Sequence, residues 1–194
     1  MRAKEFSRNR TLEKCISLFW ENGFGATAVN DIVKRTGVNR FSLYEEFGNK
    51  EGLLLATLDL YIERYALPRL RPLTNVEHLQ AGLLAFYTSF FEPPVGHQKG
   101  CFIVAMALEL GNVQPEVSAK LDEYLRCLKA EFLSLLKRFT IGSETEDECD
   151  VLIEQLQGLY CSGAGIGIIL TSSEVEHYFT GALRVLLSNW KQNA

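Results

Sequence analysis

The sequence predicts an all-α fold of about nine helices, three of them packed into residues 5–47. Two observations predict it. Apolar residues recur at intervals of three and four along most of the chain, and no segment shows the period-two alternation that is typical of a strand. The chain has 194 residues, 47% of them hydrophobic, so it can bury a core in one domain or in a small module joined to a larger one.

Composition excludes several classes of protein. The longest apolar run, residues 164–170, is far shorter than the roughly 20 residues that cross a membrane. No apolar region follows the polar first ten residues, so we expect no secretory signal and a cytoplasmic location. The five cysteines include no CxxC pair and the three histidines are isolated. We therefore predict no disulfide framework, no metal site and no cofactor.

The first 50 residues contain three short helices and the start of a fourth. Gly23 ends the first helix, and Thr27 is expected to cap the second. Gly37 ends the second helix because glycine accepts the left-handed conformation there, and Asn39 is expected to cap the third. The buried side of the first helix is formed by Leu12, Cys15, Ile16 and Phe19.

The rest of the chain continues as helices separated by proline and glycine. Residues 68–72 form a short proline-containing linker in this interpretation, and Pro115 lies in the first turn of a helix, where proline is tolerated. After the first helix we expect helices over residues 28–35, over 40–47, from 50 toward 68, from 76 to the pair Pro93-Pro94, over 101–110, from 115 through 139, from 146 through 160, and from 173 to near 190.

Two of the short helices, joined by the tight turn at residues 37–39, form a helix-turn-helix pattern. A short helix fits the major groove of DNA, and side chains in its first turn reach base edges. Arg40, Ser42 and Tyr44 are expected to face outward, while Leu43 faces the core. The pattern alone is equally compatible with a helical hairpin that binds no DNA.

Charge is distributed unevenly along the chain. The formal net charge of −4 argues against a nucleic-acid partner for the chain as a whole. Residues 1–50, however, hold nine Lys/Arg against six Asp/Glu, a charge of +3, whereas the remainder carries −7. Two copies of the first segment would present about +6 to a duplex, enough for several phosphate contacts. The alternative is an ordinary solvated charged face.

Residues 18–54 hold a dense set of apolar, glycine and capping positions, which are Leu18, Phe19, Gly23, Phe24, Thr27, Val29, Asp31, Ile32, Thr36, Gly37, Val38, Leu43, Tyr44, Phe47, Lys50, Glu51, Leu53 and Leu54. With these residues the segment resembles the DNA-binding segment of the TetR family of bacterial transcriptional regulators. The rest of the chain is similar to that family in length and in its all-helical layout. The resemblance implies an N-terminal helix-turn-helix DNA-binding domain over residues 1–48 and a C-terminal helical ligand-binding and dimerisation bundle over 49–194.

The resemblance also implies a set of DNA-binding residues. Arg40, Ser42 and Tyr44 would meet bases and phosphates, and Phe41 could contact a thymine methyl group. Relatives often carry His, Tyr or Arg where this chain has two carboxylates, Glu45 and Glu46, which are expected to point along the outer side. The remaining implied residues are Thr27 and Lys50, which would reach phosphate, and Asn39, which caps the recognition helix.

The implied ligand site lies in the C-terminal helices, where an apolar bundle with a few polar groups can form a pocket. Residues 99–102 (Lys-Gly-Cys-Phe), followed by Glu109, resemble the start of the sixth helix in a TetR subgroup. A helix N-terminus and Lys99 would lower the pKa of the Cys101 thiol and make it a sensor, although the favoured alternative is a small buried cysteine with no redox role. Cys127 and Cys161 lie within apolar helical stripes and are expected in the core. The other ligand candidates, which are also compatible with an ordinary core, are Phe86, Phe90, Phe102, Met106, Tyr124 and Cys127.

Small residues over 158–167 continue a helix and follow no strand, so they are not a nucleotide-binding loop. They would let two helices approach closely at a two-fold interface. The expected interface residues are Gly158, Gly163, Gly167, Tyr178, Leu183 and Leu186.

The sequence therefore predicts a homodimeric, ligand-responsive regulator that binds palindromic double-stranded operator DNA. The expected activity is repression, relieved by a small molecule or a thiol-reactive inducer. An activator of the same fold shares every one of these features. No Ser/His/Asp or Cys/His set is apparent, so an enzyme is not predicted.

Overall fold

The computed structural model describes residues 7–74, 76–89, 100–139, 146–166 and 172–192. All regular secondary structure in these segments is helical, which confirms the predicted fold class. The elements are α1 (Arg8–Asn22), α2 (Val29–Thr36), α3 (Arg40–Phe47), α4 (Lys50–Tyr61), the π turn η1 (Ile62–Ala66), the 3-10 turn η2 (Leu67–Leu70), α5 (Arg71–Thr74), α6 (Leu79–Thr88), α7 (Phe102–Leu110), α8 (Pro115–Phe139), α9 (Glu146–Ile166) and α10 (Ser172–Gln192).

The predicted linker at residues 68–72 is wrong, because the chain stays helical from Lys50 to Thr74. The helix changes type along this run, through η1 and η2, before α5 completes it. Pro68 lies in the first turn of η2 and Pro72 in the first turn of α5, where the missing N–H groups cost no hydrogen bond. Counted as one helix, this run brings the described part of the chain to nine.

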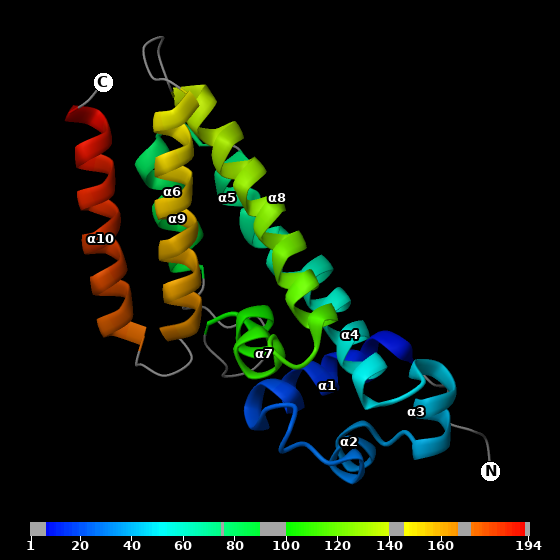
Figure 1. Cartoon of the computed structure of the whole chain (residues 1–194). Coiled ribbons are helices and arrows are strands. Elements are labelled where there is room, and N and C mark those ends of the chain that lie inside the picture. The colour runs from blue at the N-terminus through cyan, green and yellow to red at the C-terminus, as the bar shows by residue number, and fades with distance from the viewer. Residues whose placement is uncertain (1–6, 75, 90–99, 140–145, 167–171, 193–194) are drawn as a thin grey trace.

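The three N-terminal helices form a small module at the foot of the bundle (Figure 1). α1 packs on α4 and α2, and its apolar side, including Cys15, is buried as expected. α9 packs between α8 and α10 and runs antiparallel to both, and α10 also packs on α6 (Figure 1). The short α7 lies between the two parts and contacts α1, α4, α8 and α9.

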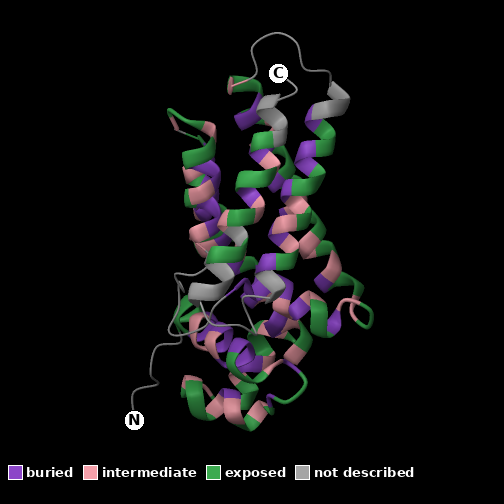
Figure 2. Ribbon diagram, turned by 90° about the vertical axis from the view of Figure 1, so that its left-hand side faces the viewer, coloured by how far each residue is buried: buried purple, intermediate pink, exposed green. Residues whose placement is uncertain are grey.

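Buried residues line the inward sides of the helices in both parts (Figure 2). They form one hydrophobic cluster that includes Leu12 of α1, Ile32 of α2 and Leu43 of α3 together with residues of the bundle. The module is therefore packed against the bundle rather than attached by a free linker. No helix in the described segments is long and apolar enough to cross a membrane.

Candidate nucleic-acid interface and the buried core behind it

The turn between α2 and α3 has the geometry that the sequence predicts. Gly37 adopts φ 78°, ψ 9°, the left-handed conformation that ends α2. The Asn39 side chain accepts the Ser42 N–H at 2.9 Å, which confirms Asn39 as the cap of α3. Ile32 and Leu43 are buried where the two helices meet. These contacts fix α3 relative to α2.

The outer face of α3 displays an aromatic and a cationic side chain. Phe41 is 77% exposed, and Arg40 is also exposed. The Arg40 guanidinium lies 5.1 Å from the centroid of the Tyr44 ring, and Tyr44 and Ser42 are half-buried. A large apolar side chain held in water gains free energy when a partner covers it. The face therefore offers charge, ring edges and an apolar contact together.

The two acidic residues of α3 are both exposed. Glu46 forms an ion pair with Arg8, with 3.0 Å between Nε and Oε1, and the Arg8 guanidinium also lies over the Phe47 ring. The ion pair offsets the charge of the Glu46 carboxylate near the end of the helix. Glu45 leaves one carboxylate on the outer side of α3.

The two residues predicted to contact phosphate, Thr27 and Lys50, both donate hydrogen bonds within the protein. Thr27 is only 1% exposed, and its hydroxyl donates to the Gly23 carbonyl oxygen at 2.6 Å. The expectation that Thr27 caps α2 is wrong, because Ala28 occupies the cap position. Lys50 donates from Nζ to the Phe24 carbonyl oxygen at 2.6 Å, and the ammonium lies 4.1 Å from the centroid of the Phe24 ring. Both side chains stabilise the turn between α1 and α2.

The same turn is bonded from the bundle by Glu109, a residue of the subgroup resemblance to which the sequence assigned no role. Glu109 of α7 accepts the backbone N–H groups of Phe24 and Gly25 at 2.9 and 2.7 Å. Glu109 is more than 80 positions from Phe24 and from Gly25, so no local pattern reveals the contact. Its only trace in the sequence is glycine at positions 23 and 25, where an added Cβ would lie 3.1 and 3.2 Å from the Glu109 oxygens.

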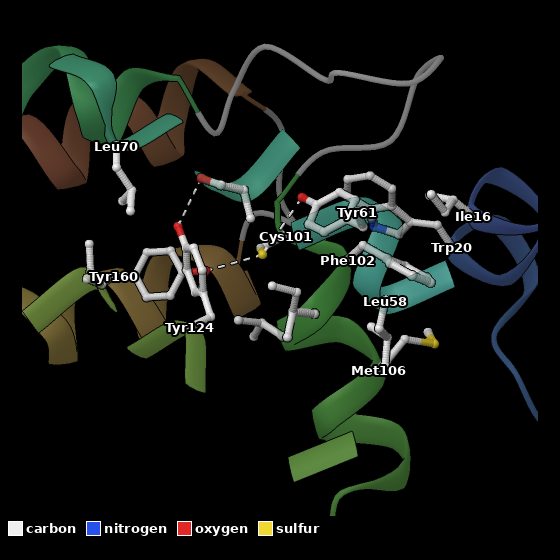
Figure 3. Packing of buried hydrophobic residues seen from close by; sticks show 14 of the residues in the cluster. Ile16, Trp20, Leu58, Tyr61, Leu70, Cys101, Phe102, Met106, Tyr124 and Tyr160 are labelled. Atoms are coloured by element: carbon white, nitrogen blue, oxygen red, sulfur yellow. Dashed lines mark hydrogen bonds between the residues drawn. The ribbon is translucent and has the colours of Figure 1, made fainter. Parts of the chain in front are cut away.

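Cys101 lies at the start of α7 among tyrosine hydroxyls in the centre of the protein (Figure 3). The hydroxyls of Tyr61 and Tyr160 donate to its Sγ at 3.8 and 3.2 Å. Arg69 donates to the Tyr61 oxygen at 3.3 Å. Burial raises the pKa of Tyr61 and of Tyr160 well above the ordinary value, so both remain neutral donors. We call Tyr61, Cys101 and Tyr160 the Cys101 cluster.

The predicted cysteine environments are partly wrong. Cys101 is at the helix N-terminus as expected, but it has no exposed surface. Cys127 was expected in the core and is exposed, because α8 buries Tyr124, Leu128 and Phe132 and leaves position 127 outside that stripe. Cys161, also expected in the core, is only half-buried.

Most of the predicted ligand candidates lie together in the core, and Phe90 lies outside the described residues. Phe86 packs edge-on against Phe132, and the Tyr124 and Tyr160 rings pack at a tilt, with their centroids 5.8 Å apart. The candidates that are buried are Phe86, Phe102, Met106 and Tyr124. All four belong to the one hydrophobic cluster of the protein, as either interpretation of them requires.

An aromatic junction that the sequence did not indicate joins the module to the bundle. Trp20 of α1 packs edge-on against Tyr61 of α4, with ring centroids 5.6 Å apart, and lies 5.8 Å from Phe102 of α7. The buried Trp20 Nε1 has no hydrogen-bond acceptor among the described residues. An orphaned donor of this kind costs about 1–3 kcal/mol.

The predicted dimer residues divide into two groups. Gly163 and Leu183 are buried within the protomer, so they belong to its own core, and Leu186 is half-buried. Gly158 and Tyr178 are exposed, and Gly167 lies outside the described residues. The outer sides of α9 and α10 also carry exposed residues at helical spacing, which are Val151, Gln155, Gly158 and Ser162 on α9 and Tyr178, Gly181, Val185 and Ser188 on α10.

Comparison with known proteins places these features in a family. Residues 12–57, which cover most of α1, all of α2 and α3 and most of α4, match the family model of bacterial regulatory proteins of the tetR family. The HTH-type transcriptional repressor ComR of Escherichia coli is 31% identical over 154 residues, 77% of this chain and 73% of ComR. The uncharacterised regulator YezE of Bacillus subtilis is 25% identical over 77% of this chain and 79% of its own length.

Solved structures have the same fold. A cysteine mutant of the TetR family regulator CifR, complexed with 26-bp operator DNA, superposes with a TM-score of 0.79 over 95% of this chain and 98% of CifR, at 19% identity. A TetR regulator from Chloroflexus aurantiacus gives a TM-score of 0.76 at 24% identity over 93% of each chain. With the identity to ComR and the match across the helix-turn-helix, these findings show that the chain belongs to the TetR family of DNA-binding transcriptional regulators.

Proposed function

We propose that the chain is a homodimeric repressor that leaves a palindromic operator when a small molecule enters the C-terminal bundle. The observation that carries the proposal is the displayed face of α3, where Arg40, Phe41 and Tyr44 stand on a helix fixed by the Asn39 cap. In a helix-turn-helix protein this face lies in the major groove. ComR, the relative with 31% identity, is named a repressor.

The DNA-binding domain in this proposal covers residues 1–48 and the ligand-binding and dimerisation domain residues 49–194. Arg40 would bond a base or a phosphate, Phe41 would cover a thymine methyl group, and Tyr44 and Ser42 would bond the backbone. The bundle would bind its ligand among the buried aromatic residues around the Cys101 cluster. A thiol-reactive inducer meets Cys101 only if it enters that core.

The dimer interface in this proposal is the outer side of α9 and α10. Gly158 and Gly181 lie inside these helices, and a Cβ added at either one would meet nothing within 4 Å of the same protomer. Glycine inside a helix destabilises it by about 1 kcal/mol relative to alanine. The close approach of a second backbone would account for glycine on an exposed helical face.

The proposal is tested by selecting duplexes from a random DNA pool with the purified chain. We expect a palindromic sequence that binds two protomers, and Tyr44→Ala and Arg40→Ala should each weaken binding at least about tenfold, the 1–3 kcal/mol that a good base contact contributes. Arg126→Ala, an exposed substitution on α8, is the matched control and should bind normally. Failure to select any duplex would overturn the proposal.

The direction of regulation is tested with the selected duplex inside a promoter that drives a reporter. Repression in the presence of the chain is expected, and Tyr44→Ala should restore expression. Increased expression would instead show the activator of the same fold. Transcription from this promoter with purified polymerase repeats the measurement in the absence of other regulators.

A further inference from the structure

The turn between α1 and α2, residues 23–28, is held by side chains from two distant elements. Glu109 accepts the N–H groups of Phe24 and Gly25, and Lys50 donates to the Phe24 carbonyl oxygen. Glu109 of α7 thus holds the peptide groups on both sides of Phe24, and Lys50 of α4 also holds the second of them. Because this turn leads directly into α2, its position determines where α2 begins.

The local sequence is shaped to accept the Glu109 carboxylate. Gly23 has φ 82°, a conformation that L side chains rarely adopt, and it ends α1. A Cβ at Gly23 or Gly25 would approach the carboxylate oxygens to 3.1 or 3.2 Å. Adjacent backbone N–H groups that face the same side bind anions, and hydrogen bonds to a charged acceptor are the stronger kind.

The place of Glu109 in its own helix supports a role outside that helix. It lies in the last turn of α7, where the helix dipole disfavours a carboxylate. The unfavourable position is offset by the two N–H groups of the turn. The contact, which we call the Glu109 contact, is thus a bond between the bundle and the module.

The other end of α7 lies in the Cys101 cluster (Figure 3). Phe102 packs there against Tyr61 and Trp20, with ring centroids 5.4 and 5.8 Å apart. A helix of nine residues is about 13 Å long, and a packed helix moves as a unit. A shift of α7 that begins at the Cys101 cluster would therefore also move the end that carries Glu109.

We propose that Glu109 is a positioning residue for DNA binding. Through the Glu109 contact it sets the orientation of α2 and α3 against the bundle, and α7 carries changes at the Cys101 cluster to that contact. The inference rests on the proposed function in one respect, because it requires α3 to read a duplex. What the inference adds is that the bundle acts on DNA binding through Glu109 and α7.

A double-mutant cycle tests the coupling. Glu109→Gln removes the charge at the contact, and Tyr160→Phe removes the hydroxyl that donates to Cys101 Sγ. The Kd for the selected duplex is measured by fluorescence anisotropy for the wild type, both single variants and the double variant. We expect each single variant to change the Kd about fivefold or more, and Tyr160→Phe to have little further effect in the chain that carries Glu109→Gln. Independent, additive effects would overturn the inference.

Two further measurements separate this role from simple stability. Amide hydrogen exchange without DNA should be faster at Phe24 and Gly25 in Glu109→Gln, while the melting temperature shows that the variant is folded. Glu116→Gln, an equal charge change at an exposed site in the first turn of α8, should change neither the exchange nor the Kd. If the wild type selects no duplex, the proposed function fails, whereas unchanged exchange at Phe24 and Gly25 contradicts this inference alone.

Discussion

The thiols of this chain differ widely in access to solvent. Cys127 is exposed on α8, whereas Cys101 and Cys15 have no exposed surface. Burial also raises the pKa of the Cys15 thiol to about 12, so the reactive thiolate is scarce at neutral pH. The reactivity of each thiol is therefore determined by whether its side of the helix is packed or exposed.

Alkylation with N-ethylmaleimide at pH 7.5 should label Cys127 first and leave Cys15 and Cys101 unmodified in the folded chain. The physical reason is that the reagent reaches an exposed sulfur directly, whereas a buried one requires opening of the core. Peptide mass spectrometry after timed labelling gives the order. Labelling in denaturant is the control, and rapid modification of Cys101 in the folded chain would contradict the burial that the structure shows.

At the scale of the element, α3 depends on its cap. Its eight residues form a helix too short to be stable alone in water, so the Asn39 bond and the burial of Leu43 hold it in place. Asn39→Ala should reduce the free energy of unfolding by about 1 kcal/mol, because it leaves the Ser42 N–H without its acceptor. Urea denaturation measures the change, and Asn39→Asp, which keeps an acceptor, should restore most of the stability.

A substitution on the outer side of α9 tests the proposed dimer interface. Gly158→Trp should leave the protomer folded, since the position is exposed and an added Cβ meets nothing within 4 Å, but should prevent a second copy from approaching. The molar mass measured by sedimentation equilibrium is expected to change from that of a dimer to that of a monomer. Ala130→Trp, at an exposed position of α8, is the matched control and should remain dimeric. A dimeric Gly158→Trp chain would place the interface elsewhere.

At the scale of the whole molecule, opposite charges are separated between the two parts of the chain. The first 50 residues carry +3 and the remainder −7. Attraction to phosphate is thus confined to the module, and the acidic bundle is repelled by the duplex. The orientation of a protomer on DNA follows from this asymmetry as well as from shape.

Binding to the selected duplex should weaken steeply with salt although the chain is acidic overall. Each phosphate contact contributes about −0.9 to the slope of log K against log salt, and Arg40→Ala in a dimer should make the slope less negative by up to about 2 if both copies of Arg40 bond phosphate. Titrations by anisotropy at several salt concentrations measure it. A slope near zero would show that the module does not bind through phosphates.

The helix-turn-helix was predictable from the sequence because it depends on local rules. Helical spacing of apolar residues, the left-handed glycine at position 37 and the Asn39 cap act within a few residues of one another. Charge counting and the residues shared with the TetR family then indicated a DNA-binding role. The helical continuation through Pro68 was missed because tolerance of proline depends on its place within a helical turn.

By itself the sequence determined the helical fold, the capped recognition helix and the family, since each follows from residues close together in the chain. Only the tertiary structure decided which side chains are free to meet a partner. It engages Thr27 and Lys50 in the turn, exposes Cys127, buries Leu183 in the protomer and brings Glu109 to Phe24. These outcomes depend on which distant surfaces pack together, and no local pattern encodes that choice.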